Sequence, residues 1–391
     1  METIQAKSLL HKIAHGEMWF GSDYNMNLYR GCCHRCIYCD SRSSCYQITD
    51  FDRVKVKKDA LLIFQKELKS KRHKGVIQLG AMSDSYNPFE QEYEITRNAL
   101  GLIAHYGFGL SLETKSNLIV RDIDYLQRIH QNADMILKLT ITAYDDAQSQ
   151  KIEPGVCVSS KRFQALKALS EQGFFTGVVL SPILPFLTDT DENIKAIIHA
   201  AYENGASFVY TIGGVTLREN QRDYYYEQLD RLFPGLKNKY QNSYGNRYLC
   251  MSKNRELIKV FQAECEKYGL LYRMRDIIRA YKKAQPQQLT LNLYHRQTDR
   301  SVIFMSTENI LKADFLANIH RLHTTPMGIS RIKRNLDLEC DDVVAYCQSI
   351  IADPHCFIYR CGKNWYCDLN GVEITVNAHS YTIITAHKKS I

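Results

Sequence analysis

The sequence lacks the features that would place the chain in a membrane or outside the cell. It contains no run of about eighteen apolar residues, so we expect no membrane-spanning helix. Residues 1–22 contain no apolar segment of the kind found in secretory signal peptides, so we expect a cytoplasmic protein. Internal repeats and low-complexity segments are also missing, which argues against solenoid and fibrous architectures.

What remains is the composition of an ordinary globular protein. The chain has 391 residues, of which 45% are hydrophobic and 24% charged. This length exceeds one average domain and suggests two. Thirteen cysteines without a secretory signal are expected to stay reduced and to serve metal binding or packing.

The net charge of +8 is unevenly distributed. From Ser306 to the end, nine basic residues balance nine acidic ones, so the whole excess lies in residues 1–305. A basic surface can follow a phosphate backbone, which makes nucleic acid a possible partner of this region. For a short run such as Lys55–Lys58, a solvated basic face is the simpler interpretation.

Four cysteines fall within eight residues, at positions 32, 33, 36 and 39. Three thiolates at spacings of x3 and x2 suit a tight loop around a soft metal site. A [4Fe–4S] cluster held by three thiolates leaves one iron free for another ligand. Zinc is the competing interpretation, because Cys36-x-x-Cys39 would serve as half of a four-cysteine site. Cys356 and Cys361 are the only candidates for the other half.

Cys32-x3-Cys36-x2-Cys39, with Tyr38 before the last cysteine, resembles the cluster loop of radical SAM enzymes. The longer segment Asn-x-Tyr-Arg-Gly-Cys-x-His-x-Cys-Ile-Tyr-Cys resembles the spore-photoproduct-lyase-like branch, also called DNA repair photolyase-like. The resemblance implies that Cys32, Cys36 and Cys39 hold three irons. It also implies that S-adenosylmethionine (SAM) chelates the fourth iron and that Tyr38 lies against its adenine. Cys33 stands where relatives often have Glu, so we interpret it as a neighbour of the cluster and not as a ligand.

Strands and helices alternate over the first 285 residues. After a short strand just before the cysteine loop, apolar segments predict strands at 75–80, 107–113, 135–142, 175–180 and 207–212. Helical patterns occur at 59–70, 92–105, 122–129, 160–172, 191–204, 223–232, 256–268 and 276–283. Six such units predict an α/β fold with a parallel sheet, and the family resemblance implies a partial (β/α)6 TIM-type barrel. In such barrels the chemistry lies at the carboxyl ends of the strands.

The polar segment Gln285–Gln288 contains a proline and predicts a domain boundary. We therefore expect a core at 1–288, a linker or strand at 289–305 and a small α+β domain at 306–391. In that tail the sequence predicts helices at 314–322 and 343–352, followed by strands at 356–360, 365–368, 372–376 and 381–386. The segments His323–Gly328, Arg331–Leu336, Gly362–Tyr366 and Asn377–His387 resemble DUF3781, a domain of unknown function.

The resemblance extends to residues that would contact SAM. Besides Tyr38, these are Ser83 and Asp84 after the second strand, Lys115 after the third, Thr140 on the fourth, and Glu153. Each also has an ordinary structural interpretation. The first two can belong to a capped turn, a strand-end lysine can snorkel, a strand threonine can simply pack, and Glu153 can pair with Arg162. The sequence identifies no further catalytic side chain.

These features predict a radical SAM enzyme. Its cluster would receive one electron from a donor such as flavodoxin or ferredoxin and cleave SAM to a 5′-deoxyadenosyl radical, which abstracts hydrogen from an unidentified substrate. Spore photoproduct lyases carry a cysteine hydrogen donor just ahead of the Ser-Asp pair, where this chain has Met82. That difference argues against thymine-dimer repair. The alternatives are modification of RNA, a peptide or a small molecule, and a non-catalytic iron–sulfur or zinc protein that binds nucleic acid.

Overall fold

The computed structural model describes residues 2–13, 19–282, 315–353, 356–361 and 364–388, with backbone only at 357 and 359–361. Contacts divide the chain into two compact units, Met1–Gln285 and Pro286–Ile391, each described here by itself. The linker or strand predicted at 289–305 lies outside the described residues. No described helix is long and apolar enough to cross a membrane.

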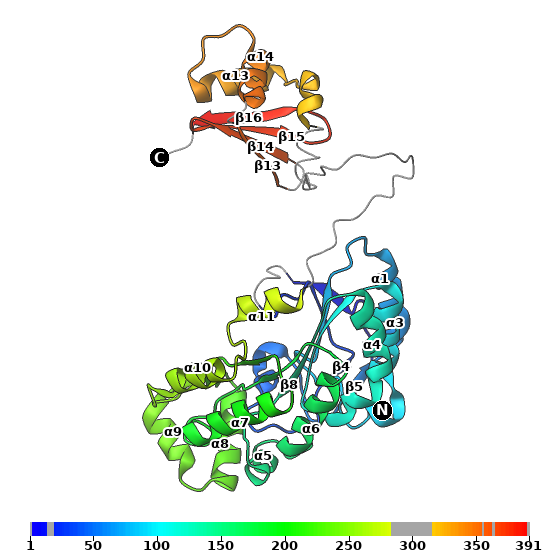
Figure 1. Ribbon diagram of the computed structural model, residues 1–391, viewed down its shortest axis with the longest axis vertical. Coiled ribbons are helices and arrows are strands. Elements are labelled where there is room, and N and C mark those ends of the chain that lie inside the picture. Colours follow the sequence, from blue (N-terminus) through cyan, green and yellow to red (C-terminus); the bar gives the residue numbers. More distant parts are fainter. Residues whose placement is uncertain (1, 14–18, 283–314, 354–355, 362–363, 389–391) are drawn as a thin grey trace, which may run out of the picture. The chain divides into compact units, whose positions relative to one another are not determined.

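The first unit is built on a seven-stranded sheet in the order β10-β9-β8-β7-β6-β3-β2 (Figure 1). Six neighbouring strands are parallel and follow one another along the chain. They are β3 (Tyr24–Met26), β6 (Val76–Leu79), β7 (Gly109–Thr114), β8 (Met135–Thr140), β9 (Thr176–Val179) and β10 (Phe208–Tyr210). The edge strand β2 (Leu10–Lys12) is antiparallel to β3. The mixed α/β class and the alternating order predicted from the sequence are confirmed.

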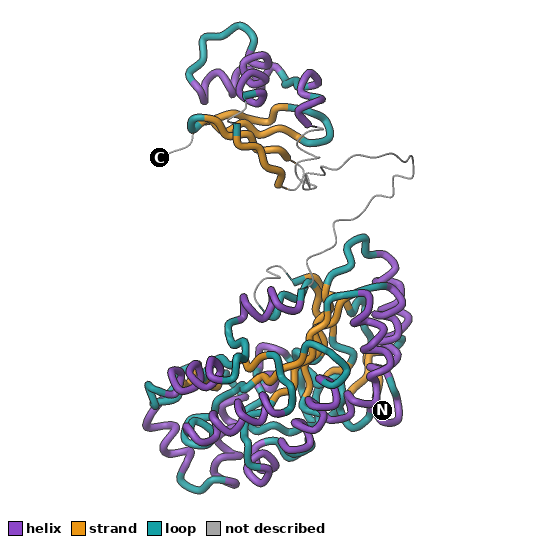
Figure 2. Tube along the Cα trace, in the orientation of Figure 1, coloured by secondary structure: helices purple, strands orange, loops and turns teal. Residues whose placement is uncertain are grey.

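Helices follow the strands and cover the sheet (Figures 1 and 2). They are α1 (Ala60–Ser70), α3 (Ile95–Tyr106), α4 (Ile123–Asn132), α6 (Ser159–Ser170), α7 (Asp191–Glu203), α10 (Leu257–Lys267) and α11 (Met274–Tyr281). Helix α7 shows why they form. The Thr190 side chain accepts a hydrogen bond from the Asn193 amide at the start, and Ile194, Ile197 and Ile198 recur at helical spacing on the buried face.

Several short elements were not predicted from the sequence. Strands β1 (Glu2–Ile4), β5 (Lys55–Lys57) and β4 (Tyr29–Arg30) form a small second sheet, and β11 (Gly214–Thr216) pairs with β12 (Leu249–Met251). The short helices are η1 (Asp40–Arg42), η2 (Ser44–Tyr46), α2 (Glu90–Tyr93), η3 (Asn117–Asp122) and α5 (Asp146–Ile152). Helix α9 (Leu236–Tyr244) was also missed, whereas α8 (Gln221–Leu232) matches the helix predicted at 223–232. The two helices pack Tyr225 against Tyr240, whose hydroxyls are 2.9 Å apart.

The second unit places two helices on one face of an antiparallel sheet (Figures 1 and 2). The strands are β13 (Phe357–Cys361), β14 (Asn364–Leu369), β15 (Val372–Asn377) and β16 (Ile383–Lys388), and the helices are α13 (Pro326–Leu336) and α14 (Val343–Ala352). Cys347, Cys356 and Cys367 are buried in its core, as expected of packing thiols. Cys361 is described by its backbone alone, so its part in a zinc site stays untested.

The tail helices differ from the prediction. Among the described residues of the expected helix at 314–322, residues 315–317 are α-helical, and the 3-10 turn η4 (Ile319–Arg321) follows them. The sequence analysis missed α13, where Pro326 occupies the first turn and the Thr325 side chain accepts a hydrogen bond from the Gly328 amide. Both are signals of a helix start. The missed helix supplies the buried Ile332 and Leu336 to the core of this unit.

We predict that the two units unfold independently. The chain has two tryptophans, Trp19 in the first unit and Trp365 in the second. In a Trp19→Phe variant, the fluorescence of the remaining Trp365 follows urea unfolding of the tail. In a Trp365→Phe variant, the fluorescence of Trp19 follows unfolding of the core. Because Ile332 is fully buried in α13, Ile332→Ala should lower the free energy of unfolding of the tail by about 2–5 kcal/mol and leave the core transition in place.

The matched variant is Ile197→Ala, which removes an equally buried isoleucine from α7. It should shift only the Trp19 transition. If either substitution moves both transitions by the same amount, the two units unfold as one cooperative body.

Candidate active site

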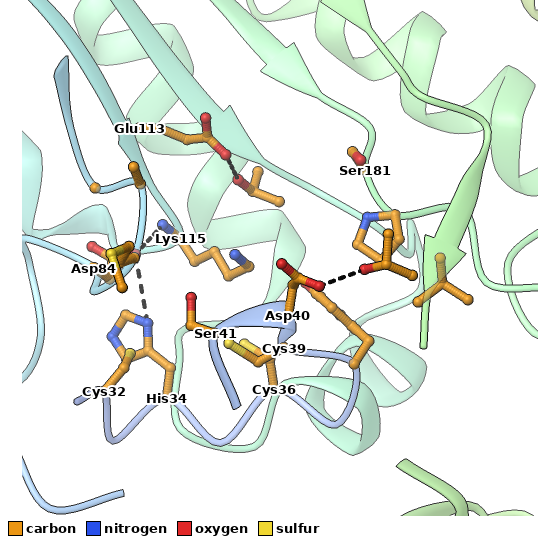
Figure 3. Close-up of a pocket in the computed structure, with 18 of the residues that line it drawn as sticks. Cys32, His34, Cys36, Cys39, Asp40, Ser41, Asp84, Glu113, Lys115 and Ser181 are labelled. Carbon is orange, nitrogen blue, oxygen red and sulfur yellow. Dashed lines mark hydrogen bonds and ion pairs between the residues drawn. The ribbon is translucent and has the colours of Figure 1, made fainter. Parts of the chain in front are cut away.

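The three predicted cluster cysteines line one cavity. Cys32 and Cys36 are buried and Cys39 is partly buried. All three border an open cavity of about 840 Å³ at the carboxyl ends of the parallel strands (Figure 3). Cys33 does not line it, which agrees with its interpretation as a neighbour. The cysteine loop therefore presents three soft donors to a common space.

The cysteine loop is held between two other segments of the chain. On one side the Cys32 amide donates to the Phe51 carbonyl at 2.8 Å. On the other side the Ile37 amide donates to Ile152 O at 3.0 Å, and the Gly155 amide donates to His34 O at 2.9 Å. A Cβ on Gly155 would lie 2.5 Å from the Cys33 carbonyl oxygen, so only glycine permits this approach.

Gly31 is required for the same reason at the opposite side of the loop. Its φ is +79°, and a Cβ there would lie 2.7 Å from the Phe51 carbonyl oxygen. Both a left-handed conformation and a close backbone contact therefore exclude larger residues at this position. The glycine before the first cysteine in the sequence motif has this physical cause.

Burial controls the protonation of the thiols. Burial, with a smaller contribution from the nearby Cys39, raises the pKa of Cys32 to about 12. Burial also raises the pKa of Cys36 well above its usual value, although the Lys115 ammonium opposes the shift. Thiols in this state are neutral until a cation displaces their protons, because thiolates are the form that binds metal.

Lys115 supplies a partly buried positive charge to the cavity. Burial alone would lower its pKa, but Cys36, Glu153, Asp84 and Glu113 together raise it above the usual value. Its Nζ atom lies 5.9 Å from the centre of the Tyr38 ring, and both residues line the cavity. The site therefore contains a permanent cation, which suits the binding of a carboxylate.

Asp84 joins three segments around the cavity (Figure 3). Its carboxylate accepts hydrogen bonds from Thr114 Oγ1 at 2.6 Å and the Lys115 amide at 2.8 Å, and it lies 3.5 Å from His34 Nδ1. Burial lowers the pKa of His34, and the Asp84 carboxylate opposes that shift. Asp84 therefore holds neighbouring segments of the site together through Thr114, Lys115 and His34. Its neighbour Ser83 is buried and does not line the cavity.

Tyr38 is supported from behind by a buried ion pair. Its hydroxyl donates to the Glu153 carboxylate, which lies 2.5 Å from Arg162 Nη1. Arg162 also donates to the Cys157 and Thr140 carbonyls at 2.9 Å each. Glu153 itself does not line the cavity. The structure therefore forms the ion pair considered as the ordinary interpretation of Glu153 and Arg162, and this pair fixes the position of the Tyr38 ring.

Thr140 lines the cavity together with Glu113, a residue that the sequence analysis did not select. Thr140 Oγ1 donates to Glu113 Oε1 at 3.2 Å. Below them, the fully buried Lys138 donates to Ser111 Oγ at 2.8 Å, and its ammonium lies 3.9 Å from Glu113 Oε2. Glu113 and Lys138 are paired in the register of β7 and β8, so they point to the same face. The sequence shows that side chains alternate between two faces along each of these strands. It does not show which of the two faces borders the cavity.

The opposite wall of the cavity comprises Ser181 and Pro182, which follow β9, and residues of strand β11, which pairs with β12. The sequence analysis missed the contribution of β11. Thr216 Oγ1 donates to Asp40 Oδ1 at 2.8 Å, which ties β11 to the end of the cysteine loop. No motif marked the pair of β11 and β12, because each strand is three residues long and the two lie more than thirty residues apart.

The donor set fits an iron–sulfur cluster. Among the described residues, no three His, Cys, Asp or Glu side chains converge to hold one metal ion. The thiolates of a [4Fe–4S] cluster each bind a different iron, so they do not have to converge on one point. Cys32, Cys36 and Cys39 face one cavity beside a partly buried cation that would balance the negative charge of a bound cluster.

Sequence comparisons agree with both resemblances. The profile of the radical SAM superfamily matches residues 26–223, and the profile of DUF3781, a protein family of unknown function, matches residues 316–387. An uncharacterized protein of Mycobacterium bovis is 27% identical over 263 residues, which cover 66% of this chain and 77% of that protein. An uncharacterized protein of Methanocaldococcus jannaschii is 34% identical over 173 residues, covering 44% of this chain and 64% of that protein.

Among solved structures, spore photoproduct lyase complexed with dinucleoside spore photoproduct is similar, with a TM-score of 0.53 and 15% identity. The similarity covers 69% of this chain and 80% of the lyase. A mutant of the lyase with bound AdoMet and the dinucleoside has a TM-score of 0.50 at 15% identity, covering 64% of this chain and 76% of the mutant. At this identity the likeness concerns the fold.

We predict that Glu153→Ala destabilises the protein even without a cofactor. The substitution leaves Arg162 buried without its carboxylate, so the free energy of unfolding should fall by about 3–5 kcal/mol in urea denaturation. Glu203→Ala is the control, because that side chain is 59% exposed beside His199 and should contribute about 0–1 kcal/mol. Glu153→Ala/Arg162→Met should recover part of the loss. A double variant less stable than the single one would contradict this account.

We also predict a pH-dependent contribution from Lys138. Burial lowers its pKa to about 8 in the folded chain, while the unfolded lysine has a pKa of about 10.4. Between these values the unfolded chain holds a proton that the folded chain has released, so the free energy of unfolding rises with pH. Below pH 8 both states are protonated and this contribution is constant. Ser111, Glu113 and the Phe20 ring are the groups that face the ammonium.

The measurement is urea unfolding of the wild type and of Lys138→Met from pH 7 to 10. The stability difference, wild type minus variant, should be flat below pH 8 and increase above it. Lys167→Met, which replaces an exposed lysine of α6, should give a constant difference. A flat difference for Lys138→Met would show that its folded pKa is normal.

Proposed function

Because the chain belongs to the radical SAM superfamily, we propose that it binds a [4Fe–4S] cluster and SAM and acts by hydrogen abstraction. The observation that carries the proposal is the cavity lined by Cys32, Cys36, Cys39 and Lys115. When bound, the reduced cluster and SAM supply a 5′-deoxyadenosyl radical, with methionine as the other product. We interpret the six parallel strands as a partial (β/α)6 barrel, whose carboxyl ends form the site.

The chain's own residues have distinct roles in this proposal. Cys32, Cys36 and Cys39 hold the cluster, and the Lys115 ammonium pairs with the SAM carboxylate. Tyr38, braced by Glu153, provides the ring against the adenine. Asp84 positions Lys115 through its backbone amide. The ribose would then lie toward Thr140.

The inner part of the cavity is available to the substrate. Glu113, Thr140, Ser181 and Pro182 line it beyond the cysteine loop. Met82 also lines the cavity, at the position before the Ser-Asp pair. Its thioether has no S–H bond to give a hydrogen atom back to a product radical. This argues against thymine-dimer repair and favours a product radical that is quenched in another way, on nucleic acid, peptide or small molecule.

We predict that the cluster depends on three of the four clustered cysteines. After anaerobic reconstitution, Cys32→Ala, Cys36→Ala and Cys39→Ala should each lose the visible absorbance of the cluster and the formation of 5′-deoxyadenosine with dithionite. Cys33→Ala and Cys45→Ala should keep both, since neither side chain lines the cavity. The measurements are iron content, the EPR spectrum of the reduced protein and chromatography of the nucleoside product.

Two results would contradict the proposal. Loss of the cluster in Cys33→Ala would overturn the ligand assignment. A wild-type protein that holds four irons and yields no 5′-deoxyadenosine would favour a non-catalytic iron–sulfur protein.

A further inference from the structure

We propose that the outer side of the cysteine loop is the docking surface of an acidic one-electron carrier protein. This inference rests on the proposed function, which requires a source of single electrons. The outer loop surface is defined here as Arg30, Cys33, Arg35 and Lys151. The occupant is a small, negatively charged flavoprotein or iron–sulfur protein, recognised through its charge.

Alternate residues of the loop face opposite sides. Cys32, His34 and Cys36 line the cavity, whereas Cys33 and Arg35 between them do not. Arg35 is exposed and Cys33 is partly exposed. Figure 3 shows the cavity side of the loop, from which the labelled cysteines and His34 extend. Cys33 and Arg35 therefore carry the outer side of the cysteine loop toward solvent, beside the backbone of Gly155, which packs on Cys33 and His34.

Other segments of the chain pack against both flanks of the loop. Residues 51–53 cover Gly31 on one side of the loop, and residues 152–155 pack on the other. Beyond the cavity lies the apolar core of the sheet, which includes Ile136, Val179 and Phe208. The cavity mouth itself is needed for SAM and the substrate. Because electron transfer weakens steeply with distance, a carrier protein has to dock close to the cysteine loop, where the Cys33 and Arg35 side chains reach the surface.

The charge of the outer loop surface is uncompensated. Arg30, Arg35 and Lys151 are exposed, and among the described residues none lies within 4.0 Å of a carboxylate. Arg30 donates to the Gln47 carbonyl at 2.7 Å, which orients its guanidinium without neutralising it.

The neighbouring acids are mostly paired elsewhere. Asp52 pairs with Arg42, Glu153 with Arg162, and Glu2 with Arg53. The exposed Asp50 offsets only part of the positive charge. Such a surface attracts an acidic protein and speeds its association. It places part of the basic excess of residues 1–305 beside the one loop that has to receive electrons.

The electron transfer balances without any movement of atoms. The carrier loses one electron, and a cluster held by Cys32, Cys36 and Cys39 gains it. No proton or group is transferred between the two proteins. The role of the arginines and lysine is therefore to hold the partner close, and they are positioning residues.

The test compares charge reversals on and away from this surface. The full-length chain carries Arg30→Glu, Arg35→Glu and Lys151→Glu singly and together, with Arg35→Gln as a neutral variant. Lys69→Glu and Lys167→Glu are the controls, because both lysines are exposed near the carboxyl ends of α1 and α6, away from the loop. A flavodoxin serves as the probe. Iron content is measured for every loaded variant.

Two readouts separate this inference from the proposed function. The first is the Kd of oxidised flavodoxin for the unloaded chain, which needs neither cluster nor turnover. The second is the ratio of 5′-deoxyadenosine formation driven by reduced flavodoxin to that driven by dithionite. The triple variant should weaken binding about tenfold or more and lower the ratio to a similar extent. Added salt should weaken wild-type binding more steeply than binding to the triple variant.

Several outcomes would overturn the proposal. One is a triple variant with unchanged Kd and unchanged ratio, which would mean that the surface is simply solvated. Another is an equal effect of Lys69→Glu and Lys167→Glu, which would show attraction by net charge alone. A third is loss of single-stranded DNA binding in the loop variants while flavodoxin binding persists, which would mean that the surface binds nucleic acid instead of a carrier protein. If dithionite gives no 5′-deoxyadenosine, the proposed function fails, and the Kd values still decide the docking question.

Discussion

The gathering of three thiols, two of them buried, beside one partly buried ammonium is the constraint on which the rest of this structure depends. Neutral thiols are tolerated in an apolar loop, but thiolates need both a metal and a counter-charge. Lys115 provides that charge at the end of β7, and Asp84 fixes its backbone from the neighbouring strand end. The parallel sheet is what brings these strand ends together, since consecutive strands leave their carboxyl ends along one edge. The glycines at 31 and 155 then let the cysteine loop approach this edge closely.

Much of this arrangement could be predicted from the sequence because its causes are local. The strand and helix periods gave the order of the α/β unit, and cysteine spacing selected the three thiols that line the cavity. The family resemblance selected Lys115, and Thr140 was a candidate SAM contact on the fourth strand; both line the cavity. Ser83 and Glu153, in contrast, do not line the cavity. A motif fixes their place in the chain, but packing decides whether the side chain reaches the cavity or a neighbouring residue. Glu153 meets Tyr38 and Arg162, while Ser83 is buried away from the cavity wall.

The features that escaped prediction are those determined by distant parts of the chain. Glu113 and Lys138 become neighbours only through the register of β7 and β8, and a one-residue shift would separate them. The antiparallel pair of β11 and β12 joins residues far apart in sequence, and no local turn reveals it. In the tail, α13 did carry start signals in Thr325 and Pro326. Its glycine and charged residues hid the apolar stripe formed by Ile332 and Leu336.

The cysteine loop has two chemically different sides, and a single loop achieves this by alternation. The loop residues that line the cavity include three thiols and an imidazole, which face a partly buried cation. Of the residues between them, Cys33 is partly exposed and Arg35 is exposed and positively charged. A loop packed on both sides by backbone can keep this alternation fixed, because neither Gly31 nor Gly155 leaves room for it to rotate. In the proposed function, SAM and substrate would occupy the cavity side of the loop, and an electron carrier would dock on the outer side. An electron would then reach the cluster without crossing the space where a radical must be shielded from solvent.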